Sequence, residues 1–263
     1  MEIDEKHIKI RKELAKDIRT LSNVLYSYFP TASLGNLEAA ITFLSSNRAV
    51  VLDKVARAEY WGYNVKEVCF KLDKFPEKRH PKDIENLELI LDFELVGNCD
   101  DIDSLKDPFL WLIFDIKIKG IYDKKDFFTS YHLDRHLYKA GDMMPVEPHP
   151  FYHFQYGGKH ILDDNKTVDS GKLIIFESPR IAHYPMELIL GIDYILSHFF
   201  PDKRIAILKS EQEYVNLIEK YQARILKPYY HTISSTWNYD HNSLNIGNHW
   251  TPSFLCPQLI INS

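Results

Sequence analysis

Half of the histidines in this chain lie close together in the sequence. Six of the twelve fall between residues 132 and 183, a span that covers one fifth of the 263 residues. The imidazole ring gains or loses a proton near neutral pH, and it is also a common metal ligand. This density of histidine makes residues 132–183 the first place to look for chemistry.

Two motifs in this region supply the first candidate side chains. "YHLDRH" spaces His132, Asp134 and His136 two residues apart. A helix would bring the two histidines onto one face, but the flanking residues favour a strand. In a strand all three share a face, with neighbours about 6.6 Å apart. In "HPFYHFQYGG", His153 and Gln155 alternate with three aromatic residues, so these two polar side chains share one face of their strand. Pairing with the preceding strand would then place them beside His132, Asp134 or His136.

A third motif, "ESPRIAHYP", adds Arg180 and His183 close to the start of a helix. Helix starts attract anions, and an arginine strengthens that attraction. The predicted site therefore consists of five residues, which are His132, Asp134, His153, Arg180 and His183.

Three interpretations of these residues remain open at the level of sequence. In the first, a divalent metal bound by His132, Asp134, His153 and His183 activates a water molecule. In the second, two histidines act as acid and base. In the third, the histidines and the aspartate form a hydrogen-bonded polar network on a sheet, because buried polar groups need partners.

The acid–base interpretation resembles the chemistry of metal-independent ribonucleases. His132 and His153 would exchange the protons, while Arg180 and Lys159 would hold a phosphate. The net charge of −5 gives no protein-wide attraction for nucleic acid, so a nucleic-acid partner is not supported by charge. The chain also lacks the common phosphate-loop, dinucleotide and nucleophile-elbow motifs.

The patterns on either side of this region predict the elements that must position it. Apolar spacing predicts helices over 5–28 and 36–60, which would form a hairpin that covers a sheet. Further helices are predicted over 184–200 and 210–228, with Ser210 as an N-cap and Pro228 as the end. Runs rich in β-branched and aromatic residues predict about five strands, over 86–97, 109–123, 126–138, 150–162 and 171–182.

Short links between these strands favour an antiparallel sheet, so the predicted fold class is α+β. The sheet is flanked by the N-terminal helical hairpin and by two C-terminal helices. We expect a single domain over 1–263, within which 1–62 could form a helical lobe. The sheet region would be 84–183, and the C-terminal helices and an aromatic tail would fill 184–263.

The C-terminal segment has an unusual composition. Its last 36 residues hold six aromatic residues and three histidines but no lysine or arginine. Such a segment is too apolar for a solvated tail, so residues 229–263 are predicted to pack on the body, bind a protein partner or mediate self-association. We therefore expect an intracellular interaction or assembly protein with a histidine-rich sheet face. The alternative is a hydrolase, of nuclease type, centred on the same face.

Several further features predict a cytoplasmic protein. No apolar run reaches the 18 or so residues that a membrane span needs. The first twenty residues are charged and amphipathic, unlike a secretory signal. The three cysteines, Cys69, Cys99 and Cys256, are widely spaced, which suits reduced thiols.

Overall fold

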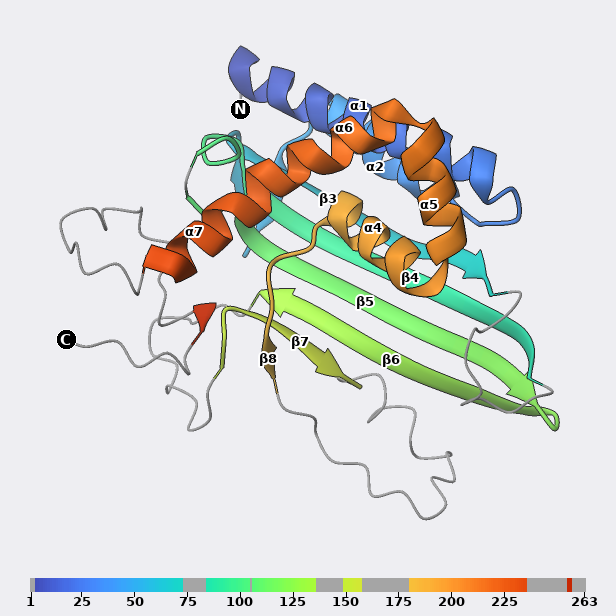
Figure 1. Ribbon diagram of the computed structural model, residues 1–263. Helices are drawn as coiled ribbons and strands as arrows, with labels where there is room; N and C mark the ends of the chain where they lie inside the picture. Colours follow the sequence, from blue (N-terminus) through green and yellow to red (C-terminus); the bar gives the residue numbers. More distant parts are fainter. Residues whose placement is uncertain are drawn as a thin grey trace.

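Six antiparallel strands form one sheet, and helices cover one of its faces (Figure 1). The computed structural model describes residues 3–72, 84–104, 106–135, 149–157, 180–235 and 255–256. The strands lie side by side in chain order. They are β3 (Tyr60–Lys71), β4 (Glu85–Asn98), β5 (Phe109–Tyr122), β6 (Lys125–Arg135), β7 (Tyr152–Tyr156) and β8 (Ile181–Ala182).

This arrangement confirms the predicted α+β class and the antiparallel pairing. The predicted strands over 86–97 and 109–123 match β4 and β5 closely. The strand β3 was not predicted, which is why the sheet has one strand more than expected. Parts of three other predicted strands, at 136–138, 158–162 and 171–179, lie outside the described residues.

Two helices precede the sheet, as predicted, but the second is shorter. α1 spans Glu5–Tyr28 and begins at Asp4, whose side chain accepts a hydrogen bond from the Lys6 N–H at 2.7 Å. α2 spans only Gly35–Ser45. The prediction of helix up to residue 60 is wrong beyond Ser45.

A short hairpin occupies the region where helix was expected. β1 (Val50–Leu52) pairs with β2 (Val55–Arg57). Asp53 and Lys54 turn the chain between them with φ angles of 50° and 66°. A pair of left-handed residues forms the tight turn that joins two twisted antiparallel strands. The valines favour the extended strand conformation, although their spacing also continues the apolar stripe of α2.

The C-terminal part contains more helix than predicted. α4 spans Leu188–Phe199, and Glu187 caps its start by accepting hydrogen bonds from two backbone N–H groups. α5 (Pro201–Ser210) was not predicted, and Ser210 ends this helix instead of capping the next. The chain continues through α6 (Gln212–Tyr221), the π-helical turn η1 (Gln222–Leu226) and α7 (Lys227–Ser235).

The helical run therefore passes the predicted end at Pro228. Proline has no N–H to donate to the preceding turn of a helix. The wider π-turn lies immediately before it, and there the Lys227 N–H donates to the carbonyl of Gln222. Such a turn commonly accompanies a change in helix direction.

The two faces of the sheet have different chemistry. On β5, Phe114 and Ile116 are buried beneath the helices, whereas Asp115 and Lys117 point to the opposite face. Phe114 stacks on Phe93 of β4 at 4.2 Å between ring centroids. We call the side without helices the polar face.

Buried residues from helices and sheet belong to one hydrophobic cluster. Leu21 of α1, Ile41 of α2, Phe93 of β4 and Leu217 of α6 are all members. The N-terminal helices thus share their core with the sheet. In the described part of the chain, no helix has the length and apolar character needed to cross a membrane.

Candidate functional site: a histidine–aspartate chain and an aromatic array

Neighbouring strands bring three of the predicted site residues together on the polar face. Asp115 of β5 lies opposite His132 of β6, and Asp134 of β6 lies opposite His153 of β7. Residues directly opposite in an antiparallel pair point to the same face. The prediction that "YHLDRH" is extended is confirmed as far as Arg135, and His136 lies outside the described residues.

The side chains of these residues form a continuous polar chain across three strands. His132 Nδ1 lies 2.5 Å from Asp115 Oδ1, and His132 Nε2 lies 3.1 Å from Asp134 Oδ2. The other oxygen of Asp134 lies 3.1 Å from His153 Nε2. We call Asp115, His132, Asp134 and His153 the histidine–aspartate chain. Asp115 is a member that the sequence prediction missed, and its alternation with Phe114 and Ile116 in the sequence is the signal that could have found it.

The two histidines of this chain have opposite pKa shifts. Burial acts to lower the pKa of His132, but hydrogen bonds to Asp115 and Asp134 outweigh it and raise the pKa to about 9. The pKa of His153 is lowered, chiefly by burial, against the attraction of Asp134. At neutral pH, His132 is therefore a cation between two carboxylates, whereas His153 is neutral.

Arg180 lies close enough to this chain to act on it. It directly precedes β8, in which Ala182 pairs with His153. Its positive charge contributes to lowering the pKa of His153. Arg180 is thus near the three converging residues, while Lys159, the other predicted phosphate ligand, lies outside the described residues.

His183 does not join the chain. It follows Ala182, which shares the face of His153, so the His183 ring points to the helix side of the sheet. There its ring lies 5.6 Å from that of Phe154 and 4.1 Å from that of Tyr184. Burial lowers the pKa of His183. His183 is therefore separated from the other predicted site residues, which lie on the polar face.

This placement separates the four predicted metal ligands. His183 lies on the opposite face from His132, Asp134 and His153, and both ring nitrogens of His132 contact carboxylates. Among the residues that the structure describes, no group of three or more histidine, cysteine, aspartate or glutamate side chains is arranged to hold a metal ion.

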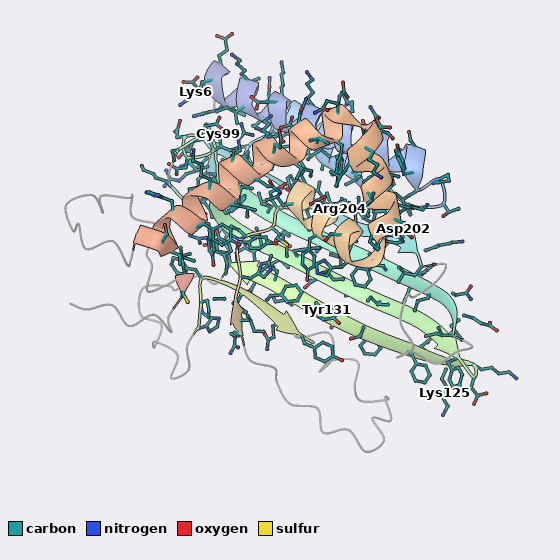
Figure 2. The ribbon with its side chains drawn as sticks, in the orientation of Figure 1. Lys6, Cys99, Lys125, Tyr131, Asp202 and Arg204 are labelled. Carbon is teal, nitrogen blue, oxygen red and sulfur yellow. The ribbon has the colours of Figure 1, made fainter. Side chains whose placement is uncertain are left out.

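The helix side of the same strands carries a feature that sequence reasoning missed. Aromatic rings from β6, β7, the link between β8 and α4, and the helices α4 and α7 form a connected series, which we call the aromatic array. Its members are Tyr131, Phe154, Tyr156, His183, Tyr184, Tyr194, His198 and Tyr230. Figure 2 labels Tyr131 on β6, below α4 in that view.

Ring-to-ring distances show that the array is continuous. Tyr131 lies 5.7 Å from Phe154 and 5.5 Å from Tyr156, measured between centroids. Phe154 lies 6.1 Å from Tyr194 of α4. These spacings are those of favourable aromatic pairs. The alternation in "FYHFQYGG" indicated that Phe154 and Tyr156 share a face, but nothing in the sequence indicated that α4 would lie beside them.

Several apolar side chains in and beside the array are exposed. Tyr156 is 49% exposed and Tyr230 51%, while Ile181, which pairs with Phe154 on the same face, is 63% exposed. Neighbouring exposed apolar side chains of this kind are typical of an interaction surface.

The C-terminal segment contributes to both the core and the array. Tyr229 is buried and Tyr230 belongs to the array. Leu255 is fully buried within the common hydrophobic cluster, and the neighbouring Cys256 thiol is close enough to influence the pKa of Tyr229. Residues 236–254 and 257–263 of the predicted partner-binding segment lie outside the described residues.

Comparisons with known proteins give no functional lead: no protein-family model, no curated protein and no solved structure matches this chain.

Proposed function

We propose that this protein is an assembly protein that binds a second copy of itself through the aromatic array. The observation that carries the proposal is the continuity of partly exposed rings from Tyr131 to Tyr230. Tyrosine and other aromatic residues are enriched at the centres of protein interfaces, where they bury large areas at low cost in conformational entropy.

The chemistry of the array favours self-association over other partners. A two-fold dimer brings the same patch of each copy together, so the patch must complement itself. Charged patches repel their own copies, whereas the array consists of tyrosine, phenylalanine and histidine rings. Aromatic rings have an electron-rich face and an electron-poor edge, so identical rings can pair favourably.

The array also includes part of the segment predicted to mediate association. Tyr230 lies within 229–263, and its ring is 6.2 Å from that of Tyr184. In this proposal the segment acts through Tyr230 while Leu255 holds it to the body.

A measurement of oligomeric state with matched variants tests the proposal. We expect sedimentation velocity to show a concentration-dependent dimer that Tyr156→Lys disrupts, because each copy would then have to bury a lysine charge in the interface. A change in the dissociation constant of about a hundredfold is typical for the loss of a central aromatic contact.

Tyr26 provides the control because it is exposed to the same degree, at 50%, but lies on α1. Tyr26→Lys should dimerise like the wild type. A wild-type chain that stays monomeric at every concentration, or a Tyr156→Lys variant that still dimerises, would show that the array is not the interface.

The opposed pKa shifts in the histidine–aspartate chain favour a second candidate, a metal-independent hydrolase. Neutral His153 would take a proton from the attacking hydroxyl group, and cationic His132 would give one to the leaving oxygen. Arg180 would offset negative charge on a phosphate. This candidate comes second because both nitrogens of His132 already contact carboxylates and His153 is only 2% exposed.

Incubation with RNA and DNA tests this candidate. Cleavage should disappear in His153→Gln, since an amide can donate a hydrogen bond to Asp134 but cannot take up a proton. His198→Gln, on the exposed surface of α4, is the matched control. Equal cleavage by His153→Gln and the wild type, with both folded by circular dichroism, would refute the assignment.

A further inference from the structure

The outer side of β6 is paired along only part of its length. β7 pairs with Tyr131–Arg135, and the Gly157 N–H donates to the Ser130 carbonyl at 2.8 Å. Among the residues that the structure describes, no strand lies against the outer side of residues 125–129. Figure 1 shows this half of β6 at the lower edge of the sheet, beyond the end of β7. We call residues 125–129 the free edge of β6.

The backbone of the free edge directs hydrogen-bonding groups away from the sheet. Residues of an antiparallel strand point their N–H and C=O groups alternately to its two sides. The Ser130 carbonyl points outward, because it accepts from the Gly157 N–H. The backbone groups of Phe128 and Asp126, two and four residues earlier, therefore point outward as well. Such groups on an edge strand are a template for pairing with another chain.

The side chains of the free edge continue the aromatic array. Phe127 faces the helix side of the sheet, as Tyr131 does, because four residues of one strand separate them. Its ring lies 5.8 Å from that of Tyr122 at the end of β5, edge to face, and both rings are exposed. Lys125, which is labelled in Figure 2, pairs with Tyr122 at the end of this hairpin. The free edge thus carries aromatic surface beside its outward backbone groups.

We propose that the free edge of β6 pairs in antiparallel fashion with the same edge of a second copy, which joins the two sheets into one. This inference rests on the proposed self-association and adds the strand at which the two copies meet. A two-fold dimer brings the same surface of each copy together, so the edge must complement itself. The order of its residues meets that requirement.

One register suits the free edge best. Outward-pointing residues must lie opposite one another, so Asp126 pairs with Phe128 of the second copy and exchanges two backbone hydrogen bonds with it. Phe127 then lies on the two-fold axis and meets its own counterpart in a pair whose side chains approach closely. A shift in one direction sets Asp126 against its own negative charge. A shift in the other requires Ser130, whose carbonyl is already bound to Gly157.

This register also brings the aromatic array of one copy to the free edge of the other. β7 and the second copy's β6 follow one another along the same side of β6. Tyr156 lies opposite Tyr131. The second copy's Lys125 lies opposite Thr129, which is two residues from Tyr131 and about 6.6 Å along the strand. Its ammonium group therefore approaches the exposed ring of Tyr156, a favourable cation–π arrangement. The array and the edge thus form one interface.

A proline at an outward position tests the backbone contact. The Asp126 N–H points away from β5, so Asp126→Pro removes no hydrogen bond from the sheet of the monomer. We expect the dissociation constant in sedimentation velocity to rise about tenfold to a hundredfold, because the dimer loses two equivalent hydrogen bonds. Asp126→Ala keeps the N–H, so the difference between the two variants isolates the backbone contact. Circular dichroism confirms that both variants are folded.

A disulfide tests the register directly. Phe127→Cys places two thiols on the two-fold axis. Facing residues of a non-hydrogen-bonded pair lie about 4.5 Å apart between Cα atoms, within the range that a disulfide spans. Oxidation should therefore link the two copies. Ile121→Cys, an exposed position on β5 and one strand farther from the axis in each copy, should stay unlinked, as should the wild type with its three cysteines.

The variants separate this inference from the proposed function. An Asp126→Pro variant that dimerises as tightly as Asp126→Ala, or a Phe127→Cys variant that stays unlinked, overturns the pairing of free edges. If Tyr156→Lys is monomeric in that case, the array remains the interface. If Asp126→Pro and Phe127→Cys behave as expected while Tyr156→Lys still dimerises, the edges pair and the array is refuted. A wild-type chain that is monomeric at every concentration overturns both.

Discussion

At the scale of single residues, the charge of His132 depends on the two carboxylates that contact it. His132 lies between Asp115 and Asp134, and these contacts outweigh the cost of burial. Among the residues that the structure describes, Asp134 is the one carboxylate in contact with His153, and burial dominates its pKa. The number of acidic neighbours, more than burial itself, therefore separates the two histidines.

This difference predicts how stability depends on pH. The folded protein holds the His132 proton with a pKa of about 9, above the ordinary value of 6.5. The resulting stabilisation is therefore fully present below pH 6.5 and is lost as the pH rises through 9. Its upper limit is about 3 kcal/mol, from the size of the shift.

Asp115→Asn should remove much of this stabilisation. The amide keeps the shape of the carboxylate but carries no charge, so we expect the pKa of His132 to fall. The free energy of unfolding should drop by about 1–2 kcal/mol near pH 6 and by less near pH 10. Urea denaturation at the two pH values, with an NMR titration of the imidazole, measures both effects.

Glu88→Gln supplies the comparison on the same face. Glu88 pairs with Lys119 at 3.5 Å, and this partly exposed contact is worth little. Its loss should leave the alkaline slope of stability unchanged. If Asp115→Asn also left that slope unchanged, the carboxylate contact would not be the cause of the raised pKa.

At the scale of elements, helix α4 approaches the sheet unusually closely. Gly191 lies over the stacked pair of Phe93 and Phe114. A Cβ atom at this position would lie 2.7 Å from Phe93 Cε1 and 3.1 Å from Phe114 Cε1. The absence of a side chain at Gly191 therefore sets the distance between α4 and the strands β4 and β5.

Gly191→Ala should consequently destabilise the protein. Alanine favours helix over glycine by about 1 kcal/mol, but overpacking of a core costs about 1–3 kcal/mol. We expect a net loss of about 1 kcal/mol in chemical denaturation. Gly35→Ala in the first turn of α2 has no atom within 4 Å of its new Cβ and should be neutral or stabilising. Equal stability of the two variants would contradict the close contact.

Sequence patterns predicted the elements best where one face of a strand is polar. The alternation in β5 gave that strand to within one residue, and it also placed Asp115 correctly. The apolar spacing gave a wrong prediction of helix in the segment after α2, because Val51 and Val55 fit a helical stripe as well as a hairpin. The left-handed conformation of Asp53 and Lys54 decides between the two, and apolar spacing does not report it.

The candidate site was predictable only as far as strand register could be inferred. His132, Asp134 and His153 converge because they lie on consecutive strands with matching alternation. The face to which His183 points depends on the register of the two-residue strand β8. A shift of that register by one residue would reverse the face. The aromatic array depends on how α4 packs across β6 and β7, a tertiary contact between segments far apart in sequence.

At the scale of the whole molecule, the chain returns to its own core close to the C-terminus. Leu255 is buried in the common hydrophobic cluster. Its chain neighbour Cys256 lies close enough to Tyr229 of α7 to influence the pKa of that tyrosine, although the two residues are far apart in sequence. A segment that acts only as a partner-binding arm has no need for such an anchor. The composition of residues 229–263 alone could not distinguish these roles, since aromatic and apolar residues suit either.

Leu255→Ala tests whether this anchor stabilises the monomer. Removing a fully buried leucine side chain typically costs about 2–5 kcal/mol, and we expect a loss in that range. Exposed Ile121→Ala, at the end of β5, should change stability by less than about 0.5 kcal/mol. The free energy of unfolding should be measured in the monomeric Tyr156→Lys background, so that loss of association does not contribute. A negligible effect of Leu255→Ala there would mean that the segment is not part of the core, and its burial would then have to serve association instead.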